Sequence, residues 1–393
     1  MPTQRELLLK HLAPTSDSPI GLEIERAEGV YMYSPEGKKY MDLIAGISVS
    51  NVGHRHPKVV EAIKEQVDKH LHLMVYGEYV QSPQVRFADQ LSSVLPETLN
   101  SVYFVNSGSE AVEGAIKLAK KATGRTGLIS FENAYHGSSN GALSLMGNEE
   151  FKAPFYPLLP ESFVVRFNNF EDLNSITNET AAVFLETIQG EAGIRVPQLE
   201  YMKALRKRCT EVGALLVLDE IQCGFGRTGT MFAFEHFGIV PDVLLIAKGM
   251  GGGMPIGAFI SSKELMTNLS HDPILGHITT FGGHPVCCAA GSACLSVIKE
   301  DGFLETIKKK EELFRNHLQH TEIKEVRGMG MMLAVQLRDS EQLFPTIDRC
   351  IENGIVTDWF LFCDSAMRIA PPLTITEDQI IEACTIINES ITN

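Results

Sequence analysis

Seven short, nearly all-apolar segments follow one another along the middle of this 393-residue chain, and they constrain its fold more than any other feature. A run of apolar residues without polar alternation is typical of a strand that is buried on both faces of a sheet. Helical patterns separate several of these segments, and strands that alternate with helices predict a mostly parallel sheet covered on both sides. We therefore predict an α/β fold whose strands are 102–105, 128–131, 163–165, 181–185, 215–218, 243–246 and 256–260.

The two ends of the chain differ from this middle part. Near the N-terminus, the turn sequence Ser34–Lys38 separates two segments rich in aromatic and β-branched residues, which predicts a hairpin. After residue 285, a helix of small residues is followed by fewer and more polar strands, which indicates a smaller α+β unit. We therefore expect an N-terminal segment, 1–50, that joins this small domain, a large domain, 51–285, and the small domain itself, 286–393.

Composition and charge exclude several classes of protein. The formal net charge of −15 argues against a nucleic-acid-binding protein, which would normally carry a basic surface. No apolar run is long enough to span a membrane, and the first residues lack the apolar core of a signal peptide. The eight cysteines contain no Cys-x-x-Cys pair, and several lie in apolar stretches, which favours a reducing compartment. We expect a cytoplasmic protein with no nucleic-acid or membrane partner and, since no zinc-binding spacing occurs, no metal site.

Lys248 stands between an apolar run, 243–247, and a glycine-rich tract, 249–257. Lysine shifts its pKa readily when it is desolvated, which suits it to Schiff-base chemistry, and glycines allow a flat group to approach the backbone. Alternatively, Lys248 ends a strand with its ammonium in water and its stem on apolar surface. The glycine tract also loosely resembles a dinucleotide-binding loop, although no clear helix or acidic residue follows it.

The segment Asn106–Glu110 follows a predicted strand and opens a predicted helix. Small residues with free amides at the N-terminus of a helix form an anion site, most often for phosphate, and Ser107 and Ser109 would add hydroxyl donors. The alternative is a simple helix cap, because serine caps and Ser-x-x-Glu spacings are frequent.

Asp219 directly follows four apolar residues, so it lies at the carboxyl edge of the sheet, where open α/β sheets bind their ligands. A partly buried aspartate needs a cationic partner, and the pyridinium nitrogen of pyridoxal phosphate would be one. Gln222 lies on the same loop and would reach a phenolic oxygen. A cap or loop carboxylate is the other interpretation of Asp219.

Two further strand ends carry residues of interest. Tyr135 and His136 follow the predicted strand 128–131, and an aromatic ring in this place would stack on a flat cofactor or simply pack in the core. Glu186 ends the strand 181–185, and Glu191 follows it in a small loop. These two carboxylates would act beside a cofactor or would be surface charge.

Taken in order, these segments resemble the class-III (subgroup II) aminotransferases, which have the aspartate aminotransferase fold, and most of all their acetylornithine and ornithine branch. The similarity spans roughly residues 20–380, and the spacing of 29 positions between Asp219 and Lys248 is specific to this family. It is carried by the motifs Asn106–Ala111, Tyr135–Gly137, Glu186–Glu191, Leu218–Gly229, Ala247–Gly249, Thr279–Gly283 and Arg368–Pro372.

The resemblance implies a pyridoxal-phosphate-dependent transferase of fold type I with defined residue roles. Lys248 would form the Schiff base with the cofactor and then move the proton during the reaction. The other roles implied are Asp219 at the pyridine nitrogen, Gln222 at the ring hydroxyl, Tyr135 stacked on the ring, His136 and Glu186 among the cofactor-binding residues, Ser107, Gly108 and Ser109 at the phosphate, and Thr280 at the phosphate of the neighbouring subunit. A homodimer with shared active sites would follow.

The resemblance also implies how substrates bind. Glu191 would pair with Arg368 and swing aside when a 2-oxo acid arrives, so that the arginine could hold its α-carboxylate by a bidentate fork. An amine or amino acid and a 2-oxo acid would then alternate at one site in a ping-pong reaction.

The sequence departs from the family at two positions. Acetylornithine and ornithine aminotransferases usually have an arginine after the aromatic-x-Gly triplet as a second carboxylate clamp, and here this residue is Ser138. His284 stands where asparagine is common. The functions open at this point are transfer of an amino group from an ω-amino acid or amine to 2-oxoglutarate or pyruvate, an aminomutase or lyase reaction on the same fold, a nicotinamide-dependent oxidation, and a catalytically silent binding protein.

Overall fold

A central sheet of seven strands organises the computed structural model, which describes residues 3–391. The strand order is β4-β10-β9-β8-β7-β5-β6, and β10 alone runs antiparallel to its neighbours. The predicted strands are confirmed to within one residue at each end: β4 (Ser101–Val105), β5 (Gly127–Phe131), β6 (Ser162–Val165), β7 (Thr180–Glu186), β8 (Leu215–Asp219), β9 (Val243–Ile246) and β10 (Gly257–Ser261).

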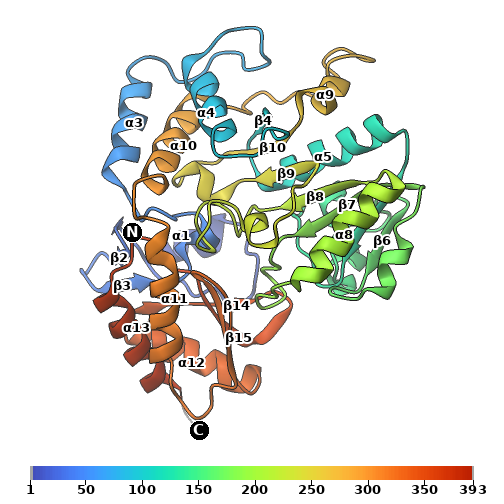
Figure 1. The fold of residues 1–393 in the computed structure, drawn as a ribbon. Coiled ribbons are helices and arrows are strands. Elements are labelled where there is room, and N and C mark those ends of the chain that lie inside the picture. The colour runs from blue at the N-terminus through green and yellow to red at the C-terminus, as the bar shows by residue number, and fades with distance from the viewer. Residues whose placement is uncertain (1–2, 392–393) are drawn as a thin grey trace.

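Helices cover both faces of this sheet, as Figure 1 shows. On β7, Val183 and Leu185 belong to the core that includes helix α8 (Leu199–Val212), whereas Ala182 and Phe184 belong to the core that includes helix α5 (Gly108–Thr123). Because successive side chains of a strand point to opposite faces, the two helices lie on opposite sides of the sheet. The expectation that every strand is buried on both faces is wrong for the edge strand β6, where Phe163 is exposed.

A second core is built from the two ends of the chain. Its strands form one sheet of β11 (Glu325–Met329), β12 (Met332–Gln336), β15 (Cys363–Ile369) and β14 (Trp359–Phe360), and a second sheet of β1 (Arg26–Glu28), β2 (Tyr31–Tyr33), β3 (Lys39–Asp42) and β13 (Ile355–Val356). The helices α11 (Glu305–His317), α12 (Ser340–Glu352) and α13 (Glu377–Ser390) pack on it. The expected hairpin is the β2–β3 pair, and β13 runs parallel to β3 beside it.

The boundary between the large and the small domain stays a prediction. Helix α10 (Pro285–Ile298), which begins at the predicted boundary, packs on α3 (Pro57–Val67) and α4 (Ser82–Ser92), as seen in Figure 1. Its Cys288, Cys294 and Leu295 belong to the core of the large sheet. No helix among residues 3–391 has both the length and the apolar character needed to cross a membrane.

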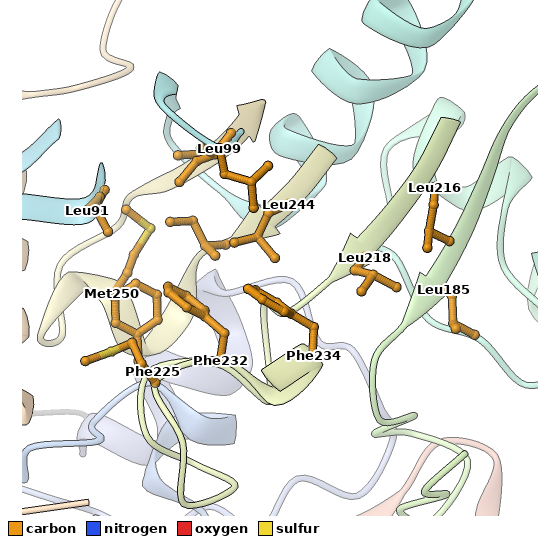
Figure 2. Packing of buried hydrophobic residues seen from close by; sticks show 14 of the residues in the cluster. Leu91, Leu99, Leu185, Leu216, Leu218, Phe225, Phe232, Phe234, Leu244 and Met250 are labelled. Carbon is orange, nitrogen blue, oxygen red and sulfur yellow. The ribbon is translucent and has the colours of Figure 1, made fainter. Parts of the chain in front are cut away.

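Apolar packing anchors the two loops that follow β8 and β9. Figure 2 shows Phe225, Phe232 and Phe234 from the first loop and Met250 from the second within one buried cluster. The rings of Phe232 and Phe234 are stacked 5.9 Å apart, and Phe225 meets Phe232 edge-on at 5.5 Å. These loops carry Gln222 and Lys248, so the core fixes both of them.

The remaining elements are short or peripheral. They are α1 (Gln4–His11), α2 (Ala45–Ser48), α6 (Asn140–Ser144), α7 (Glu149–Lys152), α9 (Lys263–Met266) and the 3₁₀ turns η1 (Ala153–Phe155), η2 (Glu171–Ser175), η3 (Ala233–Phe237), η4 (Lys248–Gly251) and η5 (Thr267–Leu269).

Candidate active site

A cavity of about 700 Å³ opens at the carboxyl ends of β4, β5, β7, β8 and β9. The loops after these strands meet there, as the parallel arrangement requires. Ten of the residues predicted for the site line it: Ser107, Gly108, Ser109, Tyr135, His136, Glu186, Glu191, Asp219, Gln222 and Lys248. Arg368 and Thr280 do not.

The start of α5 forms one wall of the cavity. Ser107 caps the helix by accepting a hydrogen bond from the Glu110 amide at 3.2 Å, and the hydroxyl of Ser109 lies 2.7 Å from that of Ser139. A Cβ on Gly108 would lie 2.8 Å from the Ile221 side chain, so glycine is needed for this close packing. Ser107 is therefore the cap of α5 as well as a residue that lines the cavity, and the first amides of α5 are available for an anion.

Asp219 is buried and holds His136, which is also buried. Its Oδ2 lies 2.7 Å from Nδ1 of His136, and its Oδ1 accepts a hydrogen bond from the Ile221 amide at 3.0 Å. Burial favours the neutral ring, but the hydrogen bond and the charge of Asp219 outweigh burial and raise the pKa of His136. The carboxylate thus has a hydrogen-bonded histidine as its neighbour and lines the cavity.

Glu186 joins two loops of the site through their backbones. Its carboxylate accepts hydrogen bonds from the amides of Tyr135 and Gly190, each at 2.7 Å. Burial raises the pKa of Glu186 to about 7, against the opposing effect of His136. Glu186 therefore holds Tyr135 in place through the main chain, in addition to lining the cavity.

Lys248 begins the turn η4 with a left-handed backbone, at φ 44°. A non-glycine residue adopts this conformation only where the surrounding structure imposes it. Burial lowers the pKa of the Lys248 ammonium, while the nearby Glu191 carboxylate opposes the change. A lowered pKa increases the fraction of neutral amine, which is the nucleophilic form.

Glu191 and Arg368 form a buried, two-pronged ion pair beside the cavity. The Nη1–Oε1 and Nη2–Oε2 distances are 3.1 and 3.0 Å. Arg368 lies on β15 of the second core, and its Nε also donates to Asp358 at 2.8 Å. Burial alone would raise the pKa of Glu191, but the charge of Arg368 prevails and lowers it. The pair places a guanidinium from the second core directly behind the cavity wall.

The structure also identifies residues that the sequence interpretation missed. Ile188, Ile221, Ser139, Met254 and Ile256 line the cavity, and Asp358 holds Arg368. Ile221 was within reach of prediction, because it lies between Asp219 and Gln222 on one loop. No sequence pattern pointed to Asp358, since its partner, Arg368, lies on a different strand, β15.

Two further residues singled out in the sequence are exposed. Thr280 does not line the cavity. Ser138 is exposed at the rim, with its hydroxyl 3.2 Å from that of Tyr135. Lys248 is the one cationic side chain other than a histidine among the described residues that line the cavity.

The groups of the cavity fit a flat, phosphate-bearing pyridine cofactor. The start of α5 offers amides for the phosphate, Asp219 offers a carboxylate for a ring nitrogen, and Tyr135 and Ile221 offer flat or apolar surfaces. The buried Oε1 of Gln222 has no hydrogen-bond partner within residues 3–391, so this amide retains capacity for a ring hydroxyl.

Comparisons with known proteins agree with this chemistry. The family model of the class-III aminotransferases matches residues 12–391. An acetylornithine aminotransferase of Methanopyrus kandleri is 40% identical over 96% of each chain. A LysW-aminoadipate semialdehyde/glutamate semialdehyde transaminase of Sulfolobus acidocaldarius is 36% identical over 94% of this chain and 95% of its own.

A solved structure is similar over the whole length. The ornithine aminotransferase of Toxoplasma gondii, described with partial occupancy of pyridoxal phosphate at its active site, superimposes with a TM-score of 0.90. Its sequence is 28% identical, and the match covers 99% of this chain and 94% of that one.

Proposed function

Because this chain belongs to the class-III aminotransferases, which are pyridoxal-phosphate-dependent transaminases of fold type I, we propose that it moves an amino group from an ω-amino acid or amine to a 2-oxo acid such as 2-oxoglutarate or pyruvate. The observation that carries the choice of substrates is the buried Glu191–Arg368 pair beside Lys248. In one half-reaction, Arg368 would bind the carboxylate of a substrate. In the other, Glu191 would neutralise Arg368, so that an uncharged or cationic end of a substrate could be accepted.

We assign to the residues of the cavity the roles that the family resemblance implies. Lys248 would hold the cofactor covalently, and its Nζ would accept and return a proton. Asp219, which is hydrogen-bonded to His136, would keep the pyridine nitrogen protonated, and Gln222 would hold the ring hydroxyl. Tyr135 would pack on the ring, Glu186 fixes the Tyr135 loop, and Ser107, Gly108 and Ser109 would hold the phosphate. The bound cofactor supplies an electron sink for the negative charge that develops at the substrate carbon.

Arg368 and Glu191 alternate between the two half-reactions. With Glu191 in place, its carboxylate neutralises the guanidinium, so an amine donor does not meet the charge of Arg368. When Glu191 leaves, Arg368 offers its fork to the α-carboxylate of a 2-oxo acid. One site thus serves both substrates in turn, as a ping-pong reaction requires.

The residue at position 138 bears on the choice of amine donor. The M. kandleri relative is named for acetylornithine, and the S. acidocaldarius relative for LysW-linked semialdehydes. Here Ser138 occupies the position of the usual second arginine, and it offers a hydroxyl rather than a charge. We therefore place amines and simple ω-amino acids ahead of acetylornithine and ornithine as donors.

We further propose a homodimer and a cytoplasmic location. Residues 75–78 line a second cavity of about 690 Å³ together with Val85, Ile274 and Ile278, which expose apolar side chains there. An exposed apolar patch of this kind marks a protein interface. The exposed Thr280 lies next to this surface, where it would reach a partner's phosphate. Seven of the eight cysteines are buried and all are free, which supports a reducing compartment.

The two half-reactions can be measured separately by stopped-flow spectroscopy of the cofactor. We expect Arg368→Ala to reduce the rate with 2-oxoglutarate about 100-fold more than the rate with an uncharged primary amine, since it removes one partner of a buried charged contact. Glu191→Gln is the matched variant, and it should impair the amine half-reaction more than the 2-oxo acid half-reaction. Equal losses in both half-reactions of Arg368→Ala would refute the assigned role.

A further inference from the structure

Arg227 is a fully buried arginine that the proposed reaction does not use. It is the largest of the side chains with less than 2% exposure. Its described hydrogen bonds go to uncharged oxygens: Nη1 donates to the Met331 and Pro371 carbonyls at 3.1 and 2.5 Å, and Nη2 donates to Oδ1 of Asn51 at 2.5 Å. Burial lowers the pKa of Arg227 to about 9, and the charge of Asp42 only partly offsets this.

These contacts join three separate parts of the chain. Arg227 lies in the loop after β8, Asn51 lies in the N-terminal part, and Met331 and Pro371 border the strands of the second core. The main chain adds a further link between the loop after β8 and the second core, because the Met331 amide donates to the Arg227 carbonyl at 2.8 Å. Pro371 lies three positions after Arg368, directly beyond the end of β15.

Asn51 connects the contacts of Arg227 to the backbone around Lys248. Its Nδ2 donates to the Phe225 carbonyl at 3.0 Å, and its own carbonyl accepts from the Leu373 amide at 2.8 Å. A Cβ placed on Gly249 would lie 2.5 Å from Nδ2 of Asn51, so the backbone that follows Lys248 rests directly on this amide. The strained turn at Lys248 and the end of β15 are therefore connected through Asn51 and Arg227.

We propose that Arg227 is a positioning residue that sets the distance between Lys248 and the Arg368 guanidinium. The proposal rests on the function assigned to Arg368 above. A 2-oxo acid has to meet two demands at once, since its reacting carbon must lie within proton-transfer reach of Lys248 while its carboxylate is held by Arg368, whereas a simple amine needs only the first. A small shift between the two parts of the molecule would therefore affect only the first of these substrates strongly.

A role in stability alone does not account for an arginine at this position. A buried cation without a carboxylate contact carries a large desolvation cost, and apolar side chains of similar volume often stabilise such sites better. The fixed fork of a guanidinium, however, can hold three oxygens from different segments in one plane, which no apolar side chain does.

Arg227→Met tests the proposal, with Arg125→Met as the matched control. Arg125 also donates to three uncharged oxygens, the carbonyls of Thr180, Val212 and Gly213, but it does so at the opposite end of the sheet. In Arg227→Met we expect KM for 2-oxoglutarate to rise about 10-fold with a smaller change in kcat, and KM for an amine donor to stay within about 3-fold of the parent. Arg227→Lys, which keeps the charge and reaches fewer oxygens, should be intermediate and serves as the test if the methionine variant does not fold.

Hydrogen exchange supplies a readout that is independent of activity. The Met331 and Leu373 amides should exchange faster in Arg227→Met than in the parent. In Arg125→Met, the exchange rates of these two amides should equal those of the parent. Equal increases of KM for both substrates, or a profile like that of Arg125→Met, would overturn the proposal. Arg368→Ala in the same assay separates a failure of the positioning role from a failure of the proposed function. If Arg368→Ala discriminates between the two substrates and Arg227→Met does not, the positioning role fails while the proposed function stands.

Discussion

Three buried glutamates around the site differ in the direction of their pKa shifts. Glu191 contacts a guanidinium, and its pKa is lowered although burial opposes this. Glu186 and Glu220 are held mainly by backbone amides, and burial raises the pKa of each to about 7. Charge pairing therefore keeps ionised the one carboxylate that has to release an arginine, while its neighbours hold the loops.

Glu220 makes the stability of the cofactor-free protein depend on pH. Its pKa rises from an ordinary value of 4.5 to about 7 on folding, so between these values the folded chain holds a proton that the unfolded chain has released. The free energy of unfolding should therefore fall as pH rises through this window, by at most about 1.4 kcal/mol per pH unit for one group. Glu220→Gln should reduce this slope, as measured by urea unfolding at several pH values between 5 and 7.

Glu235→Gln is the control for this measurement, because Glu235 caps the same turn from an exposed position. Glu186 retains its own contribution in both variants. A parental slope in Glu220→Gln would show that this carboxyl group does not titrate on unfolding.

At the scale of elements, the sequence predicts those features that depend on the residues of a single segment. The strands of the central sheet are short apolar runs, so their positions followed from sequence, and residues placed just after them were bound to meet at one edge of the sheet. This is why Asp219, Tyr135 and Ser107 could be assigned to one site. The burial of β6 was overestimated, because a sequence does not state which strand forms the edge of a sheet.

Pairings between distant segments leave no local pattern in the sequence. Ile355 pairs with Met41, and the Glu191–Arg368 pair, which depends on how β15 docks on the other core, was expected from the family resemblance alone. The small-residue helix α10 was visible in the sequence, but its partner was not: a Cβ on Gly291 would lie 2.6 Å from the Phe87 ring. Such contacts depend on tertiary packing, which no periodicity encodes.

At the scale of the whole molecule, the apolar surface around the second cavity marks the face on which a second copy is expected. Ile274 is 77% and Val85 is 53% exposed there, and the strand β4, which also lines the cavity, is one edge of the central sheet. The opposite edge, β6, also exposes an apolar residue, Phe163, but is not associated with this cavity. The two edges therefore provide a test and its control within one protein.

Ile274→Glu should weaken the dimer, since it places a charge in an apolar interface. Light scattering is expected to give the mass of two chains for the parent and for Phe163→Glu, and a smaller average mass for Ile274→Glu. The latter should also retain less cofactor on dialysis if Thr280 serves the partner's site. A parent that is monomeric at micromolar concentration would contradict the dimer.

Peptide mapping can identify the lysine that carries the cofactor, which we expect to be Lys248. The protein is saturated with pyridoxal phosphate, reduced with borohydride to fix the lysine-bound cofactor, digested and analysed by mass spectrometry, with Lys263→Ala as a control for an exposed lysine outside the cavity. We predict one modified peptide, which contains Lys248, in the parent and in Lys263→Ala, and none in Lys248→Ala. A modification that remains in Lys248→Ala, or that lies on another lysine in the parent, would contradict the account.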